Sequence, residues 1–493
     1  MKKNSLIVLL ATFAFSFLFY KQSQGLNHGI FSVIIPLLFL ILKPELRTET
    51  NWILAAIACL YSGTVAAITG SPVTILLNMF CILVVSYISV SPKLSVITGS
   101  VYAGLSSLSG LFIAGVNTLT NYLTLTPVVE EKTKTRFRWY YLALPLFILI
   151  IFLELYRQSS GAFMNLTNKI DLSFISPGWI LFTLAGFLFL YGIFNKPKEF
   201  DFFELETKLD NEVTKQYNWK TSGFLITGII LFSLLNFLLI VVNISDIIYL
   251  CFLDQSKMDM SYAELIHQGV GSLIVTLVLA VGFILLWINQ HDLDPKLNRI
   301  LKIVALIWIL LNMVLLVTNI YKNNLYIETY GLTFLRIGVY FFLLLAFLTL
   351  IFCSYKIVNY KSNWFMYRKF GVVVLSLALV FSCFNWNKII ASHNIDLYKK
   401  GEIAADTYYL LELSNDCLPM IVNNWKLLNK DNETFLNQKL DLRCRKFLEE
   451  FELKDWRSNS INNYNTARLL KNYKPKTEFT VYELECRLFY DRF

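Results

Sequence analysis

Residues 262–336 read YAELIHQG, then an apolar span to Trp287, the turn NQHDLDPKLNR, a second apolar span to Val317, and NIYKNNLYIETYGLTFLR. A helix of about 20 residues crosses a hydrocarbon core of about 30 Å, and each apolar span is close to that length. Two such spans joined by a short turn return the chain to the side where it started. The polar ends of this stretch are therefore expected to meet on one side of a membrane.

The whole chain shares this apolar character. Hydrophobic residues make up 56% of the 493 residues, charged residues only 16%, and the mean hydropathy is +0.53. Soluble domains do not have this composition. The apolar runs are continuous rather than alternating, as the strands of a membrane β-barrel would be. The sequence predicts an all-α polytopic transmembrane helical bundle whose surroundings are the lipid bilayer.

About twelve spans are predicted, with eleven to thirteen compatible with the pattern. The apolar runs lie at 6–20, 26–42, 52–69, 72–90, 94–116, 139–155, 177–194, 223–242, 269–287, 300–317, 337–355 and 370–384. The glycine- and serine-rich run 94–116 is expected inside the bundle, because small residues let membrane helices approach closely. After Phe384 the composition becomes that of a soluble protein. We therefore divide the chain into a transmembrane bundle, 1–384, and a small C-terminal helical domain, 385–493.

The longest polar stretch between spans is 195–222. Leu205, Leu209, Val213 and Tyr217 recur in it at four-residue spacing, which predicts an amphipathic helix at the membrane surface. A helix that docks a partner is the alternative.

Lysine and arginine in alternate loops indicate the orientation. The basic loops contain Lys132, Lys134, Arg136, Arg138, Lys196, Lys198, Lys208, Lys215, Lys220, Lys296, Arg299, Lys302, Lys356, Lys361, Arg368 and Lys369. These loops are predicted to be cytoplasmic, which places the C-terminal domain on the extracytoplasmic side. Twelve spans would then put the N-terminus outside, whereas Lys2 and Lys3 favour the inside, and the sequence leaves this conflict open. The net charge of +9 is explained by these loops, so no nucleic acid partner is predicted.

Three cysteines follow the last span, namely Cys417, Cys444 and Cys486. In an oxidising compartment two of them could form a disulfide, and the sequence does not choose the pair.

Polar residues at the ends of the opening stretch form the candidate cluster. Glu264 and His267 share one helix face in an E-x-x-H pattern, which is half of a di-metal carboxylate site. A second E-x-x-H is absent, so a polar helix entry is the simpler interpretation and no metal is predicted. Glu328 and Arg336 flank the start of the next span. Arg336 needs a partner beside apolar residues, and Glu264 or Glu328 would supply one.

His393, after the last span, is the other extracytoplasmic histidine of the candidate cluster. Asparagines within the spans are assigned to hydrogen bonds between helices, which each contribute about 0.6–2 kcal/mol. The chain contains no P-loop, G-x-S-x-G, H-E-x-x-H or glycine-rich dinucleotide motif, so it gives no motif evidence for an enzyme, a catalytic residue or a cofactor.

Several segments, in this order, resemble a known family. They are FYKQSQGLN, YAELIHQG, YKNNLYIETYGLTFLR, NKIIASHNID, DTYYLLELSNDCLPMI and DWRSNSINNYNTARLL. Together they are similar to a bacterial polytopic membrane family catalogued as a domain of unknown function, number forty-one seventy-three, related to forty-one fifty-three. The resemblance implies a bacterial inner-membrane protein with a helical C-terminal region. It implies no activity, ligand or catalytic residue.

Three classes of function fit these observations. The first is a sensor, scaffold or assembly factor of the cell envelope, with an envelope protein partner bound through the C-terminal domain. The second is a transporter or channel for a small solute, which predicts a polar cavity lined by asparagines. The third is a membrane-embedded transferase, which requires carboxylates converging near Glu264 and Glu328.

Overall fold

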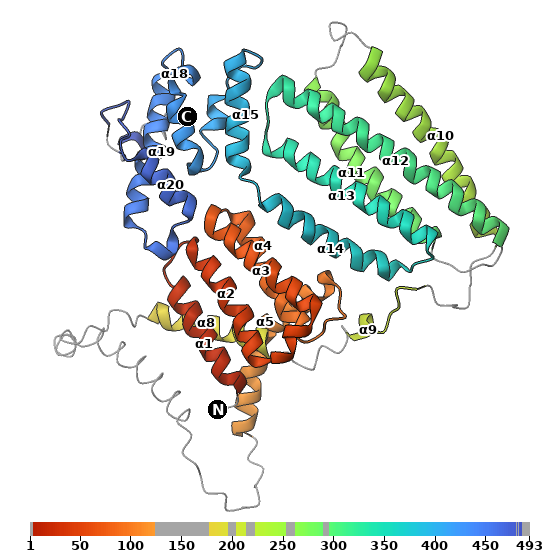
Figure 1. Cartoon of the computed structure of the whole chain (residues 1–493), viewed down its shortest axis with the longest axis horizontal. Helices are drawn as coiled ribbons and strands as arrows, with labels where there is room; N and C mark the ends of the chain where they lie inside the picture. The colour runs from red at the N-terminus through yellow and green to blue at the C-terminus, as the bar shows by residue number, and fades with distance from the viewer. Residues whose placement is uncertain are drawn as a thin grey trace, which may run out of the picture. The chain divides into compact units, whose positions relative to one another are not determined.

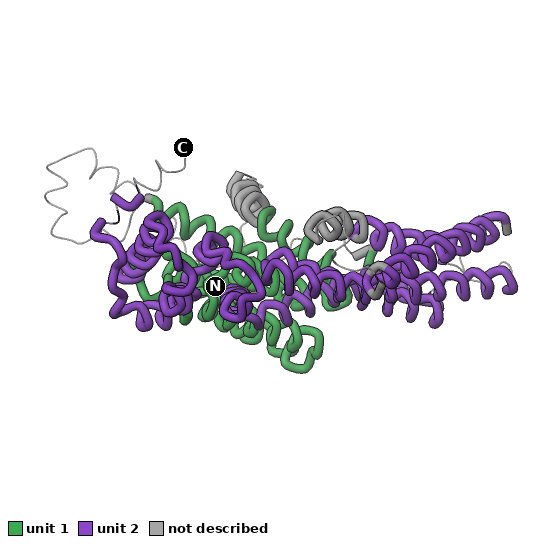
Figure 2. The backbone as a smooth tube through the Cα atoms, turned by 90° about the horizontal axis from the view of Figure 1, so that it is seen from above, with its two compact units in different colours: residues 1–206, 453–462 green, residues 207–452, 463–493 purple. Residues whose placement is uncertain are grey.

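The computed structural model describes residues 3–123, 177–195, 204–212, 222–252, 262–288, 295–479, 481 and 483–485. Within these ranges the regular elements are helices, and strand pairing is limited to one isolated bridge between Glu212 and Lys361. Two compact units emerge, coloured separately in Figure 2: unit 1, residues 1–206 with 453–462, and unit 2, residues 207–452 with 463–493. Near its C-terminus the chain thus returns to unit 1 for ten residues.

The described part of unit 1 contains six long helices. They are α1 (Lys3–Phe19), α2 (Leu26–Leu42), α3 (Thr50–Thr69), α4 (Pro72–Ile88), α5 (Val96–Leu123) and α8 (Pro177–Phe194), with the short η1 (Pro44–Thr48) after α2. The first five pack in succession, and α8 packs against α1 and α5 (Figure 1). Gly70, in the left-handed region with φ +61°, ends α3, and Pro72 begins α4. These two residues make the tight turn between them possible.

Small residues bring the helices of unit 1 close together. A Cβ atom on Gly192 of α8 would lie 2.1 Å from the carbonyl oxygen of Ser106 in α5. Ser106 and Ser107 are fully buried, as predicted for the glycine- and serine-rich run. In α4, Asn78 Nδ2 donates to Ser32 Oγ of α2 at 2.7 Å. Close backbone approach and polar bonds between helices are how membrane helices pack.

Within the residues that the structure describes, unit 2 contains five long helices and a group of shorter ones. The long helices are α10 (Ser222–Phe252), α11 (Tyr262–Trp287), α12 (Pro295–Tyr330), α13 (Phe334–Val358) and α14 (Asn363–Ser382). Asn236 and Asn243 of α10 donate their amide hydrogens to the carbonyls of Val304 and Leu311 in α12, at 2.9 and 3.0 Å. These two asparagines have the interhelical role that the sequence predicts.

The shorter helices of the C-terminal region follow Phe384. They are α15 (Trp386–Lys400), α16 (Thr407–Leu410), α17 (Leu418–Asn423), α18 (Trp425–Leu428), α19 (Thr434–Leu453) and α20 (Ile461–Leu470), with η5 (Asn415–Cys417) and η6 (Trp456–Ser458). Their hydrophobic core also includes Ile327, Leu332 and Ile337, which belong to the end of α12, the following turn and the start of α13. The core therefore extends across the boundary at 384 that we predict from composition.

Apolar helices confirm the predicted helical membrane bundle. Five helices of the described chain are long and apolar enough to cross a membrane, and five shorter helices are also apolar. Large apolar side chains on these helices face outward, among them Phe237, which is 70% exposed, and Val278, which is 64% exposed. Such surface is costly in water and is covered by lipid in a bilayer. Eleven of the predicted runs coincide with a helix, and the run 139–155 lies outside the described residues.

The predicted amphipathic helix through Leu205 and Tyr217 is wrong for the part that the structure describes. The helix α9 covers only Glu204–Thr207, and the chain then turns. The carbonyl oxygen of Asp210 accepts a hydrogen bond from Ser362 Oγ at 2.8 Å, and that of Asn211 accepts one from the Ser362 amide at 2.9 Å. Pairing with residues about 150 positions away thus replaces helical bonds in this segment.

Candidate functional site

The turn between α12 and α13, residues 331–333, is held by side chains of the C-terminal region. Gly331 has φ +79°, a left-handed conformation that favours glycine. The Asn394 side chain of α15 accepts a hydrogen bond from the Leu332 amide at 2.6 Å and donates one to the Leu332 carbonyl at 2.9 Å. The Phe334 amide donates to the hydroxyl of Tyr409 at 3.2 Å. Three hydrogen bonds to side chains of the C-terminal region therefore fix this turn.

Arg336 is buried at the same turn, with 8% of its surface exposed. Its guanidinium carbon lies 3.9 Å from the ring centroid of Tyr326 and 5.9 Å from that of Tyr330, and the group donates a hydrogen bond to the Gly331 carbonyl. The aromatic faces stabilise the charge that a carboxylate was expected to stabilise. Among the described residues no carboxylate lies within 4.0 Å of Arg336, and Glu328 is exposed.

The other candidate residues are distributed differently. Glu264 and His267 lie in the first turns of α11, where the side chains are outside the described residues. His393 precedes Asn394 in α15, is half-buried, and its Nε2 atom has no hydrogen-bond partner in the part of the chain that the structure describes. The described residues contain no group of three or more metal-binding side chains. The structure thus brings Arg336 together with tyrosines and a glycine carbonyl, and not with Glu328.

Asn394→Ala should destabilise the α12–α13 turn by about 2–3 kcal/mol, because the Leu332 amide and carbonyl each lose a partner. Asn394→Asp should cost less, since a carboxylate still accepts from the amide. Thermal unfolding of the purified protein in detergent would measure both changes. Equal melting temperatures for the two variants would contradict the assignment of both bonds to this side chain.

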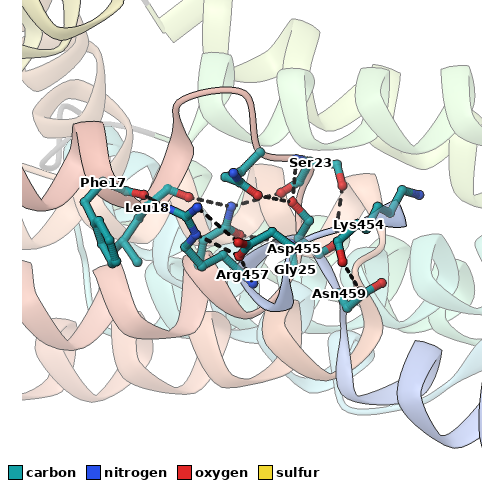
Figure 3. A network of polar contacts seen from close by, with 11 residues as sticks. Phe17, Leu18, Ser23, Gly25, Lys454, Asp455, Arg457 and Asn459 are labelled. Carbon is teal, nitrogen blue, oxygen red and sulfur yellow. Dashed lines mark hydrogen bonds and ion pairs between the residues drawn. The ribbon is translucent and has the colours of Figure 1, made fainter. Parts of the chain in front are cut away.

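A second site, which the sequence did not reveal, is formed by residues 453–462 on the turn between α1 and α2. We call this segment the strap (Figure 3). The Ser23 amide donates to Ser458 Oγ at 2.9 Å, and the Leu26 amide donates to the Asn459 carbonyl at 3.2 Å. Arg457 donates to the Phe17 carbonyl and lies 4.7 Å from the Phe17 ring centroid. The strap therefore satisfies backbone groups at the end of α1 and the start of α2.

Within the strap, Asp455 orients Arg457. Its Oδ1 atom accepts hydrogen bonds from the Arg457 amide at 2.9 Å and from the Arg457 Nε at 2.8 Å, and these two bonds fix the direction of the arginine side chain. This hydrogen bonding lowers the pKa of the Asp455 carboxyl below its usual range. Gly25 is needed opposite the strap, because a Cβ atom there would lie 2.6 Å from the Ser458 carbonyl carbon. Contact between the strap and this turn also requires both to be on the same side of the membrane.

A buried carboxylate organises the end of the C-terminal region. Asp441 of α19 is fully buried and accepts hydrogen bonds from the amides of Lys476 and Thr477, from Thr477 Oγ1 and from the hydroxyl of Tyr473. Arg445 donates to the carbonyls of Thr477 and Phe479, at 3.1 and 2.6 Å. Residues 473–479 are therefore attached to α19 by one acceptor and one donor side chain. Burial and the bond to Asp441 raise the pKa of Tyr473.

Cys417 and Cys444 are free thiols in the core of the C-terminal region, and Cys486 lies outside the described residues. Both are fully buried, and burial raises the pKa of each thiol to about 12. At pH 8 the thiolate fraction should then be about a thousandfold lower than that of an ordinary cysteine.

Alkylation of Cys417 and Cys444 by iodoacetamide should consequently be at least about a hundredfold slower in the native protein than in denaturant. Mass spectrometry of the modified peptides would follow it, with a Cys417→Ser/Cys444→Ser variant as the baseline. Rapid labelling of either thiol in the native state would show that this core opens.

A cavity of about 350 Å³ lies among α10, α11 and α12. Two asparagines of α12, Asn312 and Asn319, line it together with apolar side chains and with Asp246 and Lys322, whose charged atoms are 2.7 Å apart. Both amides donate to carbonyls of their own helix, at 2.8 Å each. The buried Oδ1 atom of Asn312 has no partner among the described residues. The cavity is thus partly polar.

Apolar helices of spanning length and polar sites at their ends define a multi-pass helical membrane protein. A family model described as domain of unknown function (DUF4153) matches residues 54–424, so the chain belongs to this family. No curated protein and no solved structure matches the chain. The family match includes the α12–α13 turn with Asn394 and Tyr409, and it ends before the strap and Asp441.

Proposed function

We propose that this protein is a scaffold or sensor of the cell envelope in the bacterial inner membrane, with its C-terminal region on the extracytoplasmic side. The strap is the observation that carries the proposal. It connects the last helices of the chain to its first helical hairpin, through contacts to Ser23, Leu26 and Phe17. A change in the C-terminal region is thereby transmitted to helices in the bilayer.

The strap also bears on the orientation. Because it contacts the α1–α2 turn, that turn shares the side of the C-terminal region, and α1 must then begin on the opposite side. With the C-terminal region outside, the N-terminus is cytoplasmic, in agreement with Lys2 and Lys3, and this arrangement requires an odd number of spans, eleven or thirteen, rather than twelve. Single cysteines at Asn4 and Lys471 test this arrangement in spheroplasts with a membrane-impermeant maleimide. Labelling at residue 471 alone supports it, and labelling at residue 4 alone contradicts it.

The envelope role is tested by variants that open the strap without removing a helix. Deleting residues after Phe384 would expose the core shared with Ile327 and Ile337, so it is an unsuitable test. Gly25→Ala should reproduce the sensitivity to detergents and osmotic shock of a strain that lacks the protein. Gly104→Ala, where no atom lies within 4 Å of the added Cβ, is the matched control. If the strap is open in Gly25→Ala but the strain resists detergents and osmotic shock like the parent, the proposal is wrong.

A transporter for a small solute is the second candidate, and the cavity among α10, α11 and α12 favours it. Asn312 and Asn319 line that cavity beside the ion pair of Asp246 and Lys322, as a polar path would require. Solute uptake into proteoliposomes that falls in Asn312→Leu would support this function. The transferase class has less support, because Glu328 is exposed and the described residues show no carboxylates converging on it.

A further inference from the structure

The C-terminal region contains a second cavity, of about 710 Å³, between the α18–α19 segment and residues 476–479. This volume is within the range of about 300–1,000 Å³ that is typical of small-molecule sites. Most small-molecule sites are lined by apolar side chains, whereas this one is lined mainly by lysines, amides and threonines, with Trp425 and Phe479 as its aromatic members. A ligand that fits it must therefore be rich in hydrogen-bonding groups.

The charge of the cavity favours an anion. Lys426, Lys430 and Lys476 line it, and Glu478 is the only acidic residue of the lining among the residues that the structure describes. The ammonium group of Lys430 lies 4.9 Å from the Tyr398 ring centroid, which restricts that side chain. Gln438 and Asn432 add amide groups that can bond to hydroxyls.

One wall of the cavity is organised in advance by buried amides. Asn437 Oδ1 accepts from the Trp425 indole at 2.7 Å, and Asn437 Nδ2 donates to Asn432 Oδ1 at 2.9 Å. Asn429 Oδ1 accepts a hydrogen bond from the Glu433 amide at 2.9 Å, which connects the two ends of the segment 429–433. Asn432 has a left-handed backbone, with φ +53°, and is held there by this network. A loop that is already ordered loses less conformational entropy when it binds a ligand.

The opposite wall is organised as well. Asp441 accepts from the amides of Lys476 and Thr477, and Arg445 donates to the carbonyls of Thr477 and Phe479. These bonds leave the Lys476 side chain exposed at the cavity. Both walls are therefore fixed by buried polar groups, while the lysines between them remain accessible.

From this arrangement we infer that the cavity is a binding site for an anionic saccharide, a sugar that carries phosphate or carboxylate. The lysines pair with the acidic group, and the amides and threonines bond to the sugar hydroxyls. An acidic peptide fits less well, because ten of the twelve lining residues are polar or charged, which suits a ligand with many hydroxyl groups better than a peptide that carries carboxylates alone. The inference rests on the proposed function, in which an extracytoplasmic sensor binds a ligand of this kind. The binding itself can be measured independently of that function.

The test is isothermal titration calorimetry on the full-length protein purified in detergent. The probes are glucose 6-phosphate, N-acetylglucosamine 1-phosphate and glucuronic acid, with glucose, inorganic phosphate and a hexaglutamate peptide as comparisons. At least one anionic sugar should bind, more tightly than phosphate or glucose, and more weakly as salt is added. Lys426→Gln/Lys430→Gln/Lys476→Gln should weaken that binding by about tenfold or more.

The matched control, Lys399→Gln/Lys400→Gln/Lys471→Gln, removes the same charge from exposed positions outside the cavity lining and should change the affinity by less than about twofold. Gln438→Ala, which keeps every charge, should also weaken binding. No binding of any anionic sugar, equal loss in both lysine variants, or preference for hexaglutamate would overturn the inference. Binding in the absence of any envelope phenotype would instead count against the proposed function alone.

Discussion

Asp441→Ala is expected to destabilise the C-terminal region by about 3–5 kcal/mol. The substitution removes a fully buried acceptor that two backbone amides and two hydroxyls share. Each buried donor left without a partner costs about 1–3 kcal/mol, and partial relaxation of residues 473–479 limits the sum. Hydrogen exchange of the Lys476 and Thr477 amides should become fast, and the melting temperature in detergent should fall by several degrees.

Asp431→Ala is the matched control for Asp441→Ala, because Asp431 is exposed and belongs to the same region. Its stability should stay within about 0.5 kcal/mol of the parent. Asp441→Asn should be intermediate, since an amide keeps one acceptor oxygen and introduces a donor where donors already gather. Slow exchange of both amides in Asp441→Ala would show that the turn is held by something else.

Alkaline pH should weaken the same contact. Folding raises the pKa of Tyr473, mainly through burial and also through the bond to Asp441. The folded state therefore keeps the phenol neutral at a pH where the unfolded chain ionises. This contribution is complete below the ordinary tyrosine pKa of about 10 and is lost as the pH rises above it. Tyr473→Phe should reduce the loss of stability that accompanies a shift from pH 9 to pH 11.

Gly25→Ala is expected to release the strap. The added Cβ would lie 2.6 Å from one backbone carbon of the strap and 2.7 Å from another, and neither can move like the end of a flexible side chain. Overpacking of this kind typically costs about 1–3 kcal/mol. Because the atoms in the way belong to the backbone, we expect the strap to move away from the α1–α2 turn rather than compress.

A cysteine pair reports on this release. Ser23→Cys and Ser458→Cys, introduced with Cys383→Ser, replace side chains that lie within hydrogen-bond distance of each other's backbone. The pair should cross-link readily in the parent and at least about fivefold less in Gly25→Ala, which corresponds to about 1 kcal/mol. Gly104→Ala has open space around its Cβ and should cross-link like the parent. Undiminished cross-linking in Gly25→Ala would mean that the strap tolerates the methyl group.

The sequence predicts the membrane helices well for a physical reason. Continuous apolar runs of spanning length have few alternatives in a bilayer, because backbone groups must be paired within each segment. The turns are also visible locally: Gly70 and Pro72 favour the end of one helix and the start of the next. By contrast, the stripe of Leu205 and Leu209 is misleading, because bonds from Ser362 and Arg368 hold that segment in a non-helical conformation.

The polar sites were harder to predict, since their partners are distant in sequence. Arg336 was expected to find a carboxylate, and the aromatic rings of Tyr326 and Tyr330, ten and six positions earlier, stabilise its charge instead. Asp441 did leave a signal: it follows Leu440 and precedes Cys444 on a buried helix face, where a lone carboxylate requires donors. The strap left no such signal in the sequence. Its polar residues resemble those of an ordinary loop, and only the structure shows that they contact the α1–α2 turn.

The strap and the α1–α2 turn that it contacts are synthesised at very different times. Ser23 and Ser458 are 435 residues apart. At about 5–20 residues per second, the α1–α2 hairpin is therefore synthesised about 20–90 s before the strap. During that interval the amides of Ser23 and Leu26 must be solvated. Closure of the strap therefore marks a chain that has been translated through residue 462, and chains that terminate before residue 453 cannot reach that state.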